Sequence, residues 1–138
     1  TNGVSIISKD DNVTYDNALG WIGELTIEPG KMYKIQVISD CSFTLNGVVA
    51  DPSNHMVNLS NGYNWIGFFG TQSMGLESAL SDLQPEDGDV IMDKDLSSTY
   101  YESLGWVGDI ISLEPGKGYM YKSNANNSKS FHFPSSRQ

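Results

Sequence analysis

Two copies of one pattern occur in the sequence, and this repeat constrains the fold more than any other feature. Residues 3–35 (the first copy) align with residues 88–121 (the second copy), with one extra residue near Ile110. Fifteen of the 33 aligned positions are identical: Gly3, Ile6, Lys9, Asp10, Thr14, Tyr15, Leu19, Gly20, Trp21, Gly23, Glu28, Pro29, Gly30, Lys31 and Tyr33. Since such agreement reflects a shared structural unit, we expect the two copies to fold alike.

Between the copies lies a different stretch, residues 54–86, which we call the front segment. It has no counterpart before the first copy. The chain therefore divides into a partial repeat unit over residues 1–50 and a complete unit over residues 54–134. Either a preceding front segment was trimmed away, or two copies pack around one front segment. At 138 residues, we expect the units to pack as one compact domain.

Local signals favour antiparallel β-structure. Asn-Gly at 46–47 and at 61–62 stands between strand-like stretches and predicts two hairpins. Glu-Pro-Gly-Lys at 28–31 and at 114–117 has Pro and Gly where a type II turn requires them. We expect a mainly β fold, an antiparallel β-sandwich or open-barrel-like packing of pseudo-repeated units.

One short helix is expected at about 74–83. Its apolar stripe recurs at helical spacing and consists of Leu76, Ala79, Leu80 and Leu83. Ser73 is placed to cap the start of this helix, and Pro85 lies just beyond its end.

Composition narrows the functional classes. The formal net charge of −9, without a basic stripe, opposes binding to a phosphate backbone, so we expect no nucleic-acid partner. No apolar run approaches the length of a membrane span. The single cysteine, Cys41, has no partner for an intrachain disulfide, and we expect it to be a buried or semi-buried structural residue.

Catalytic motifs are not evident. The two histidines, His55 and His132, are isolated in sequence and are interpreted as a surface residue and a strand residue. No metal-protease, nucleophile-elbow or phosphate-loop pattern accompanies them. We therefore expect no enzyme activity, no catalytic residue and no cofactor.

Aspartates gather near turns, in three pairs: Asp10 with Asp11, Asp93 with Asp95, and Asp87 with Asp89. Carboxylates at this spacing can hold Ca²⁺ through oxygen ligands, but the full EF-hand spacing is missing. A solvated turn is the simpler interpretation, and Asp93 and Asp95 are the metal candidates.

Aromatic residues are the chain's richest resource for binding, because a sugar ring packs on a π-face while neighbouring polar groups bond its hydroxyls. Tyr101 stands where the first copy has Asp16, so folding does not demand an aromatic there. By contrast, Trp21 and Trp106 are equivalent, and a recurring Trp is typical of a shared core. The candidate ligand-binding residues are Tyr101, Tyr100, Glu102, Trp106, Trp21, Trp65 and Asn64.

The stretches NLSNGYNWIGFF, GDVI and GWVGDIISLEPGKGYMYKS resemble a repeat module of secreted and cell-surface proteins from Bacteroidetes and other gut bacteria. Residues 54–133 cover a whole unit of that pattern and residues 3–47 part of one. Tyr63 and Met32 depart from it. The resemblance implies an extracellular, non-catalytic module attached to a larger multidomain protein, and it implies no particular ligand.

Together these observations predict a non-catalytic, secreted or cell-surface carbohydrate-binding module. A polysaccharide or glycan is the expected partner, and the protein is expected to be monomeric. The alternative is a structural or adhesive module that spaces domains or docks a protein partner. That alternative predicts that all three tryptophans are buried.

Overall fold

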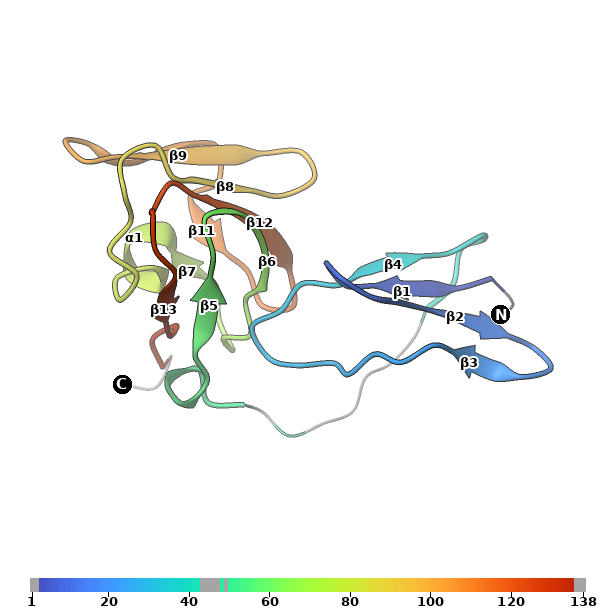
Figure 1. The fold of residues 1–138 in the computed structure, drawn as a ribbon. Helices are drawn as coiled ribbons and strands as arrows, with labels where there is room; N and C mark the ends of the chain where they lie inside the picture. Colours follow the sequence, from blue (N-terminus) through green and yellow to red (C-terminus); the bar gives the residue numbers. More distant parts are fainter. Residues whose placement is uncertain (1–2, 43–47, 49, 136–138) are drawn as a thin grey trace.

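The computed structural model describes residues 3–42, 48 and 50–135 (Figure 1). It is mainly β, with antiparallel sheets and one short α-helix, so the expected fold class is confirmed. The hairpin expected at 46–47 lies outside the described residues.

The first copy forms a four-stranded antiparallel sheet in the order β3-β2-β1-β4. Its strands are β1 (Ser5–Ile7), β2 (Asn12–Asp16), β3 (Gly20–Ile22) and β4 (Lys34–Gln36). In Figure 1 this blue and cyan sheet stands to one side of the rest of the molecule.

The second copy builds the larger sheet, in the order β10-β9-β8-β12-β6. Its strands are β8 (Val90–Met92), β9 (Ser97–Tyr101), β10 (Gly105–Gly108), β12 (Gly118–Ser123) and, from the front segment, β6 (Gly62–Gly67). Two short ladders complete the fold: β11 (Ser112–Leu113) with β7 (Met74–Gly75), and β13 (Lys129–Phe131) with β5 (Val57–Leu59).

The two copies share strand register as well as strand order. Ile6 of β1 lies between Val13 and Ile35, and its equivalent Ile91 lies between Ser98 and Tyr121. Their first turns are also built alike. The side chain of Ser8 accepts hydrogen bonds from two backbone N–H groups of its turn, as the side chain of Asp93 does. The repeat therefore predicts the local fold of both copies.

The hydrophobic core lies in the front segment, the second copy and the C-terminal strand. Its buried residues are Val57, Leu59, Ile66, Phe68, Leu76, Ala79, Leu80, Leu83, Ile91, Ile110, Leu113, Tyr119, Tyr121, Phe131 and Phe133. Among the described residues, none of this cluster comes from the first copy. The front segment is therefore the structural partner of the second copy, and β6 pairs with β12 along six residue pairs.

The expected helix forms, but it is shorter than its apolar stripe. Helix α1 spans Leu76–Ala79, because Met74 and Gly75 are taken up by strand β7. The expected Ser73 cap is wrong, since Gly75 is the N-cap and makes no side-chain capping bond. A single 3-10 turn, Pro52–Asn54, precedes β5.

The hairpin expected at 61–62 is also wrong. Strand β5 pairs with β13 and strand β6 pairs with β12, so the two strands flanking Asn61-Gly62 belong to different ladders. The reason is Asn64, whose side chain accepts from Ser60 N at 2.9 Å and donates to Ser60 O at 2.9 Å. These bonds satisfy the backbone N–H and C=O groups of Ser60 where the chain passes from one ladder to the other.

Candidate functional site

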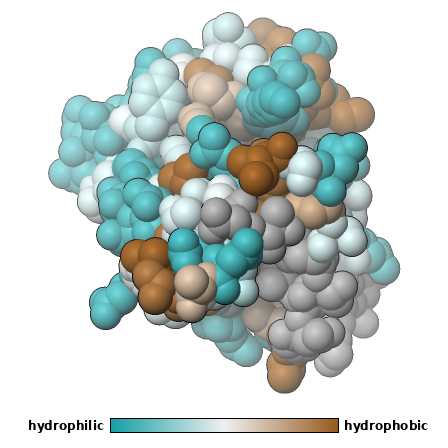
Figure 2. Space-filling view, turned by 90° about the vertical axis from the view of Figure 1, so that its right-hand side faces the viewer, coloured by the Kyte–Doolittle hydropathy of each residue, from teal (hydrophilic) through white to brown (hydrophobic). Residues whose placement is uncertain are grey.

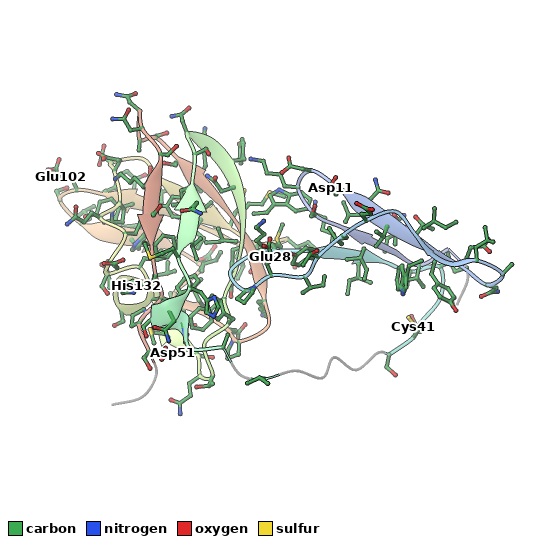
Figure 3. All side chains as sticks on the ribbon, turned by 60° about the horizontal axis from the view of Figure 1, so that its bottom comes forward. Asp11, Glu28, Cys41, Asp51, Glu102 and His132 are labelled. Carbon is green, nitrogen blue, oxygen red and sulfur yellow. The ribbon has the colours of Figure 1, made fainter. Side chains whose placement is uncertain are left out.

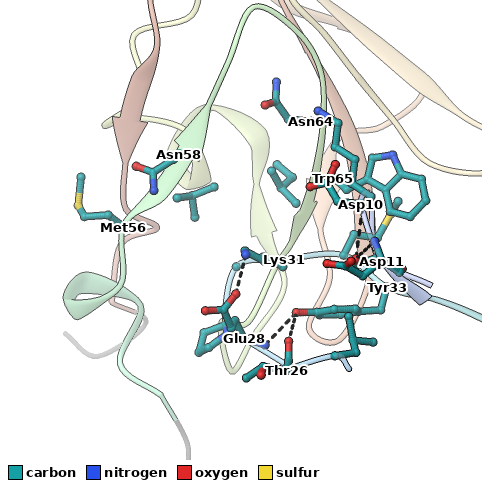
Figure 4. Close-up of a pocket in the computed structure, with 18 of the residues that line it drawn as sticks. Asp10, Asp11, Thr26, Glu28, Lys31, Tyr33, Met56, Asn58, Asn64 and Trp65 are labelled. Carbon is teal, nitrogen blue, oxygen red and sulfur yellow. Dashed lines mark hydrogen bonds and ion pairs between the residues drawn. The ribbon is translucent and has the colours of Figure 1, made fainter. Parts of the chain in front are cut away.

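A cleft of about 600 Å³ lies between the first copy and the front segment (Figure 4). Four stretches line it: residues 8–11 from the β1–β2 turn, 24–26 and 28–33 from the β3–β4 connection, 56–58, and 64–66. We call it the Trp65 cleft.

The cleft exists because the Glu-Pro-Gly-Lys turn of the first copy docks on β6. Gly67 N donates to Gly30 O at 3.0 Å, and Lys31 forms an isolated antiparallel bridge with Ile66. A Cβ atom at Gly67 would clash with the carbonyl oxygen of Lys31. Glycine at position 67 thus allows the two backbones to approach closely, and the space beside this contact remains open.

Trp65 is the principal aromatic side chain of the cleft. It is half-buried on the outer face of β6, whereas its neighbours Asn64 and Ile66 point into the core. The ammonium group of Lys34 lies 4.6 Å from the centroid of the indole, a cation–π contact that covers one face of the ring. On the same face of β6, Tyr63 is exposed, and Lys122 lies 5.7 Å from its ring.

Charged side chains surround the aromatic residues. The lining carries four carboxylates (Asp10, Asp11, Glu24 and Glu28) and two lysines (Lys9 and Lys31). Lys31 forms an exposed ion pair with Glu28 at 2.5 Å, and this hydrogen bond raises the pKa of the lysine. The cleft therefore presents more acceptors and negative charge than cations.

Tyr33 closes one wall of the cleft and is held rigidly. Its hydroxyl donates to Thr26 O at 3.0 Å and accepts from Glu28 N at 2.9 Å. The equivalent hydroxyl of Tyr119 accepts from Glu114 N at 2.9 Å. The tyrosine therefore braces the Glu-Pro-Gly-Lys turn in both copies, but Tyr119 is buried and Tyr33 faces the cleft.

The predicted cluster around Tyr101 lies elsewhere. Figure 3 places Glu102 at the far end of the molecule from Asp11 and Glu28. Tyr101 and Glu102 are exposed, whereas Tyr100 and Trp106 are half-buried with ring centroids 5.4 Å apart. Tyr100, Tyr101, Glu102 and Trp106 thus form a separate surface, and only Trp65 and Asn64 of the predicted residues line the cleft.

Two expectations about single residues need correction. Trp21 is 50% exposed, so it is not a core residue shared with Trp106. Cys41 is exposed rather than buried. Asn64 is buried and donates to the backbone oxygens of Ser60, Gly62 and Tyr121, so its amide nitrogen has a structural role.

The acidic pairs have individual environments. Oδ1 of Asp93 accepts from the backbone of Asp95 and Leu96 at 2.8 and 2.7 Å, which fixes the turn. Asp89 is buried, contrary to the expectation of a solvated turn. Over residues 3–42, 48 and 50–135, no group of three or more His, Cys, Asp or Glu is arranged to hold a metal ion.

His55 is a surface residue as expected, whereas His132 lies just beyond a strand rather than within it. His55 is exposed and packs edge-on against Phe69, with centroids 5.8 Å apart. His132 directly follows β13, and its Nε2 lies 3.8 Å from Oδ2 of Asp82. Neither residue lines the Trp65 cleft.

Sequence reasoning missed most of the cleft. Glu28 and Lys31 belong to the repeated turn and Tyr33 is an identical position beside it, so the repeat pattern indicates only a structural role for them. Because their second-copy equivalents serve the fold, the pattern does not reveal that the first-copy turn faces an open space. The departure of Met32 from the module pattern is the available signal, since its side chain lies where a Cβ of Gly118 would be.

Comparison with family models, curated proteins and solved structures gave no match. The resemblance to a bacterial surface module stays a prediction. No described helix is long and apolar enough to cross a membrane.

Proposed function

We propose that the protein is a non-catalytic carbohydrate-binding module of a bacterial secreted or cell-surface protein, and that the Trp65 cleft holds the glycan. The observation that carries the proposal is the half-buried indole of Trp65 in an open cleft of about 600 Å³ that four carboxylates also line. The indole provides an apolar face for the C–H groups of a sugar ring, and the carboxylates accept hydrogen bonds from its hydroxyls.

The charges of the cleft favour a neutral glycan. Four carboxylates and two lysines line the cleft, and the lining stays net negative when Lys34, which covers Trp65, is counted with them. A uronic acid or sulfated sugar adds like charge and is repelled, whereas neutral hexoses and pentoses offer hydroxyl donors to the carboxylates. Because Lys34 covers one face of Trp65, a sugar stacks on the other face or displaces the lysine.

Affinity electrophoresis tests this proposal. Native gels containing neutral polysaccharides (β-glucan, xylan and mannan) are compared with gels containing pectate or chondroitin sulfate. We expect retardation on at least one neutral polymer and none on the acidic ones. Absence of retardation on every neutral polymer contradicts the proposal.

A structural or adhesive module is the second candidate, although its expectation that all three tryptophans are buried is wrong, because Trp21 is 50% exposed. The observation in its favour is the apolar surface of the first copy, where Ile27, Ile35 and Val37 are exposed. Figure 2 views the molecule from this side and shows brown hydrophobic residues among hydrophilic ones. This surface suits a protein partner better than a glycan.

A further inference from the structure

The two copies differ in what covers the same sheet face. In the second copy, Leu113 and Tyr121 are fully buried, at 0% exposure. Their first-copy equivalents, Ile27 and Ile35, are 54% and 41% exposed. Ile35 and Tyr121 have the same register against β1 and β8, so their places in the two sheets are equivalent and only the cover differs. Leu113 lies in the adjacent β11–β7 ladder, which has no counterpart at Ile27.

The cover of the second copy is the front segment. Strand β6 pairs with β12, strand β7 pairs Met74 with Leu113, and helix α1 with the residues just after it brings Leu76, Leu80 and Leu83 into the same core. Glu77 of α1 also accepts a hydrogen bond from Trp106 N at 3.0 Å. The front segment therefore contributes a strand to the sheet edge, a short ladder, and a helix to the face.

Each of these places has an uncovered equivalent in the first copy. Strand β4, the equivalent of β12, is the last strand of its sheet. Residues 26–27, the equivalent of β11, are not a strand, because the partner β7 is already paired with β11. The equivalent of Trp106 is Trp21, which is half exposed.

The front segment of the chain itself is not available to cover both copies. Its β6 pairs with β12 along one edge, and on its other edge the backbone meets the first copy at the bridge between Lys31 and Ile66 and the hydrogen bond from Gly67 N to Gly30 O. Its leucines, Leu76, Leu80 and Leu83, are buried in the core with the second copy.

We propose that the apolar face and the β4 edge of the first copy form a docking surface for a second front-type segment. The occupant is a polypeptide stretch of the kind of residues 54–86, supplied from outside these 138 residues. It adds a strand antiparallel to β4 and places a leucine-bearing helix over Ile27 and Ile35. This interface repeats the one between residues 54–86 and the second copy, so the molecule is a unit of a longer stacked array.

The test is an extended protein in which an added stretch with the sequence of residues 54–87 precedes Gly3. The last residue of the added stretch, a copy of Asp87, is then joined directly to Gly3, just as Asp87 directly precedes Gly88 in the native chain. Hydrogen exchange of residues 33–38 is measured by mass spectrometry in the extended and the original protein. We expect exchange at least tenfold slower in the extended protein, because β4 gains a partner strand.

Ile35→Asp in the extended protein is the matched control and is expected to restore fast exchange of residues 33–38. Exchange of residues 118–123 reports that the main core is intact in every variant. Equal exchange of residues 33–38 with and without the added stretch overturns the proposal. A dimer of the original protein by light scattering, abolished by Ile35→Asp, also overturns it, since a second copy of the chain is then the occupant.

Discussion

The hydroxyl of Tyr121 donates a hydrogen bond to Oδ2 of Asp89 over 2.5 Å, with both side chains buried. Asp89 also accepts from Glu86 N at 3.1 Å and from Asn124 N at 2.7 Å. The first copy has Val4 and Ile35 at these two positions, so the polar pair is replaced jointly by an apolar one. The buried carboxylate is thus acceptable because three donors satisfy it.

Replacing Tyr121 by Phe tests this pair. The variant leaves Asp89 with one donor fewer, and we expect the free energy of unfolding to fall by about 1.5–3 kcal/mol, as for a hydrogen bond to a charged group. Urea denaturation at pH 7 measures the loss. An unchanged midpoint contradicts the assigned role, and Tyr101→Phe on the exposed surface is the control.

Alkaline pH gives an independent test of the same pair. Burial, and then the hydrogen bond to Asp89, raise the pKa of Tyr121 well above its ordinary value. The unfolded chain therefore loses this proton first, and the stability that the group contributes is complete below about pH 10 and falls above it. We expect the wild type to lose stability more steeply than Tyr121→Phe between pH 9.5 and 11. If the stabilities of the wild type and Tyr121→Phe fall equally with pH over this range, the assigned role of Tyr121 is wrong.

The structural role of Asn64 predicts a loss of stability rather than of binding alone. Asn64→Ala removes the bonds to Ser60, Gly62 and Tyr121, and we expect a cost of about 2–3 kcal/mol because buried backbone groups lose their partners. Asn58→Ala is the matched control. Asn58 is exposed, and its side chain accepts a hydrogen bond from the hydroxyl of Ser130 on the surface, so we expect a change within about 0.5 kcal/mol. Thermal unfolding of both variants measures the difference, and equal unfolding midpoints contradict the structural role of Asn64.

The contact between the first copy and β6 predicts different costs for two glycines. A Cβ at Gly67 meets the Lys31 backbone carbonyl, whereas a Cβ at Gly118 meets the flexible side chain of Met32. We expect Gly67→Ala to lower the stability by about 1–3 kcal/mol and Gly118→Ala by less, since side chains yield more readily than backbone. Adding Met32→Ala should restore stability to the Gly118→Ala variant but not to the Gly67→Ala variant. If Gly118→Ala lowers the stability more than Gly67→Ala does, the docking geometry is wrong.

The repeat predicted more of the fold than local signals did. Identical positions such as Trp21 and Trp106 marked equivalent strands correctly, because register depends on residues shared by both copies. The repeat did not predict which of the equivalent residues are buried. Burial depends on what covers a sheet, and the front segment covers only the second copy. This explains why Trp21 is exposed although its equivalent is half-buried.

Side-chain to backbone bonds within a turn were the second limit. An Asn-Gly dipeptide at 61–62 predicts a hairpin, but the amide of Asn64 satisfies the corner and directs the strands to different partners. The candidate site was found in part: Trp65 was predicted, while Glu28 and Tyr33 were hidden within a structural turn. Only the docking of that turn on β6 makes them part of a cleft.

The most direct test of the glycan proposal is a titration of isotope-labelled protein with an oligosaccharide of the polymer that retards it most. We expect the largest chemical-shift changes at the Trp65 indole and at Tyr33, and Trp65→Ala should weaken binding at least tenfold, or about 1.4 kcal/mol. Tyr101→Ala should leave the affinity unchanged. Shifts that gather at Tyr100, Tyr101 and Trp106, with full affinity in Trp65→Ala, contradict the assignment of the cleft.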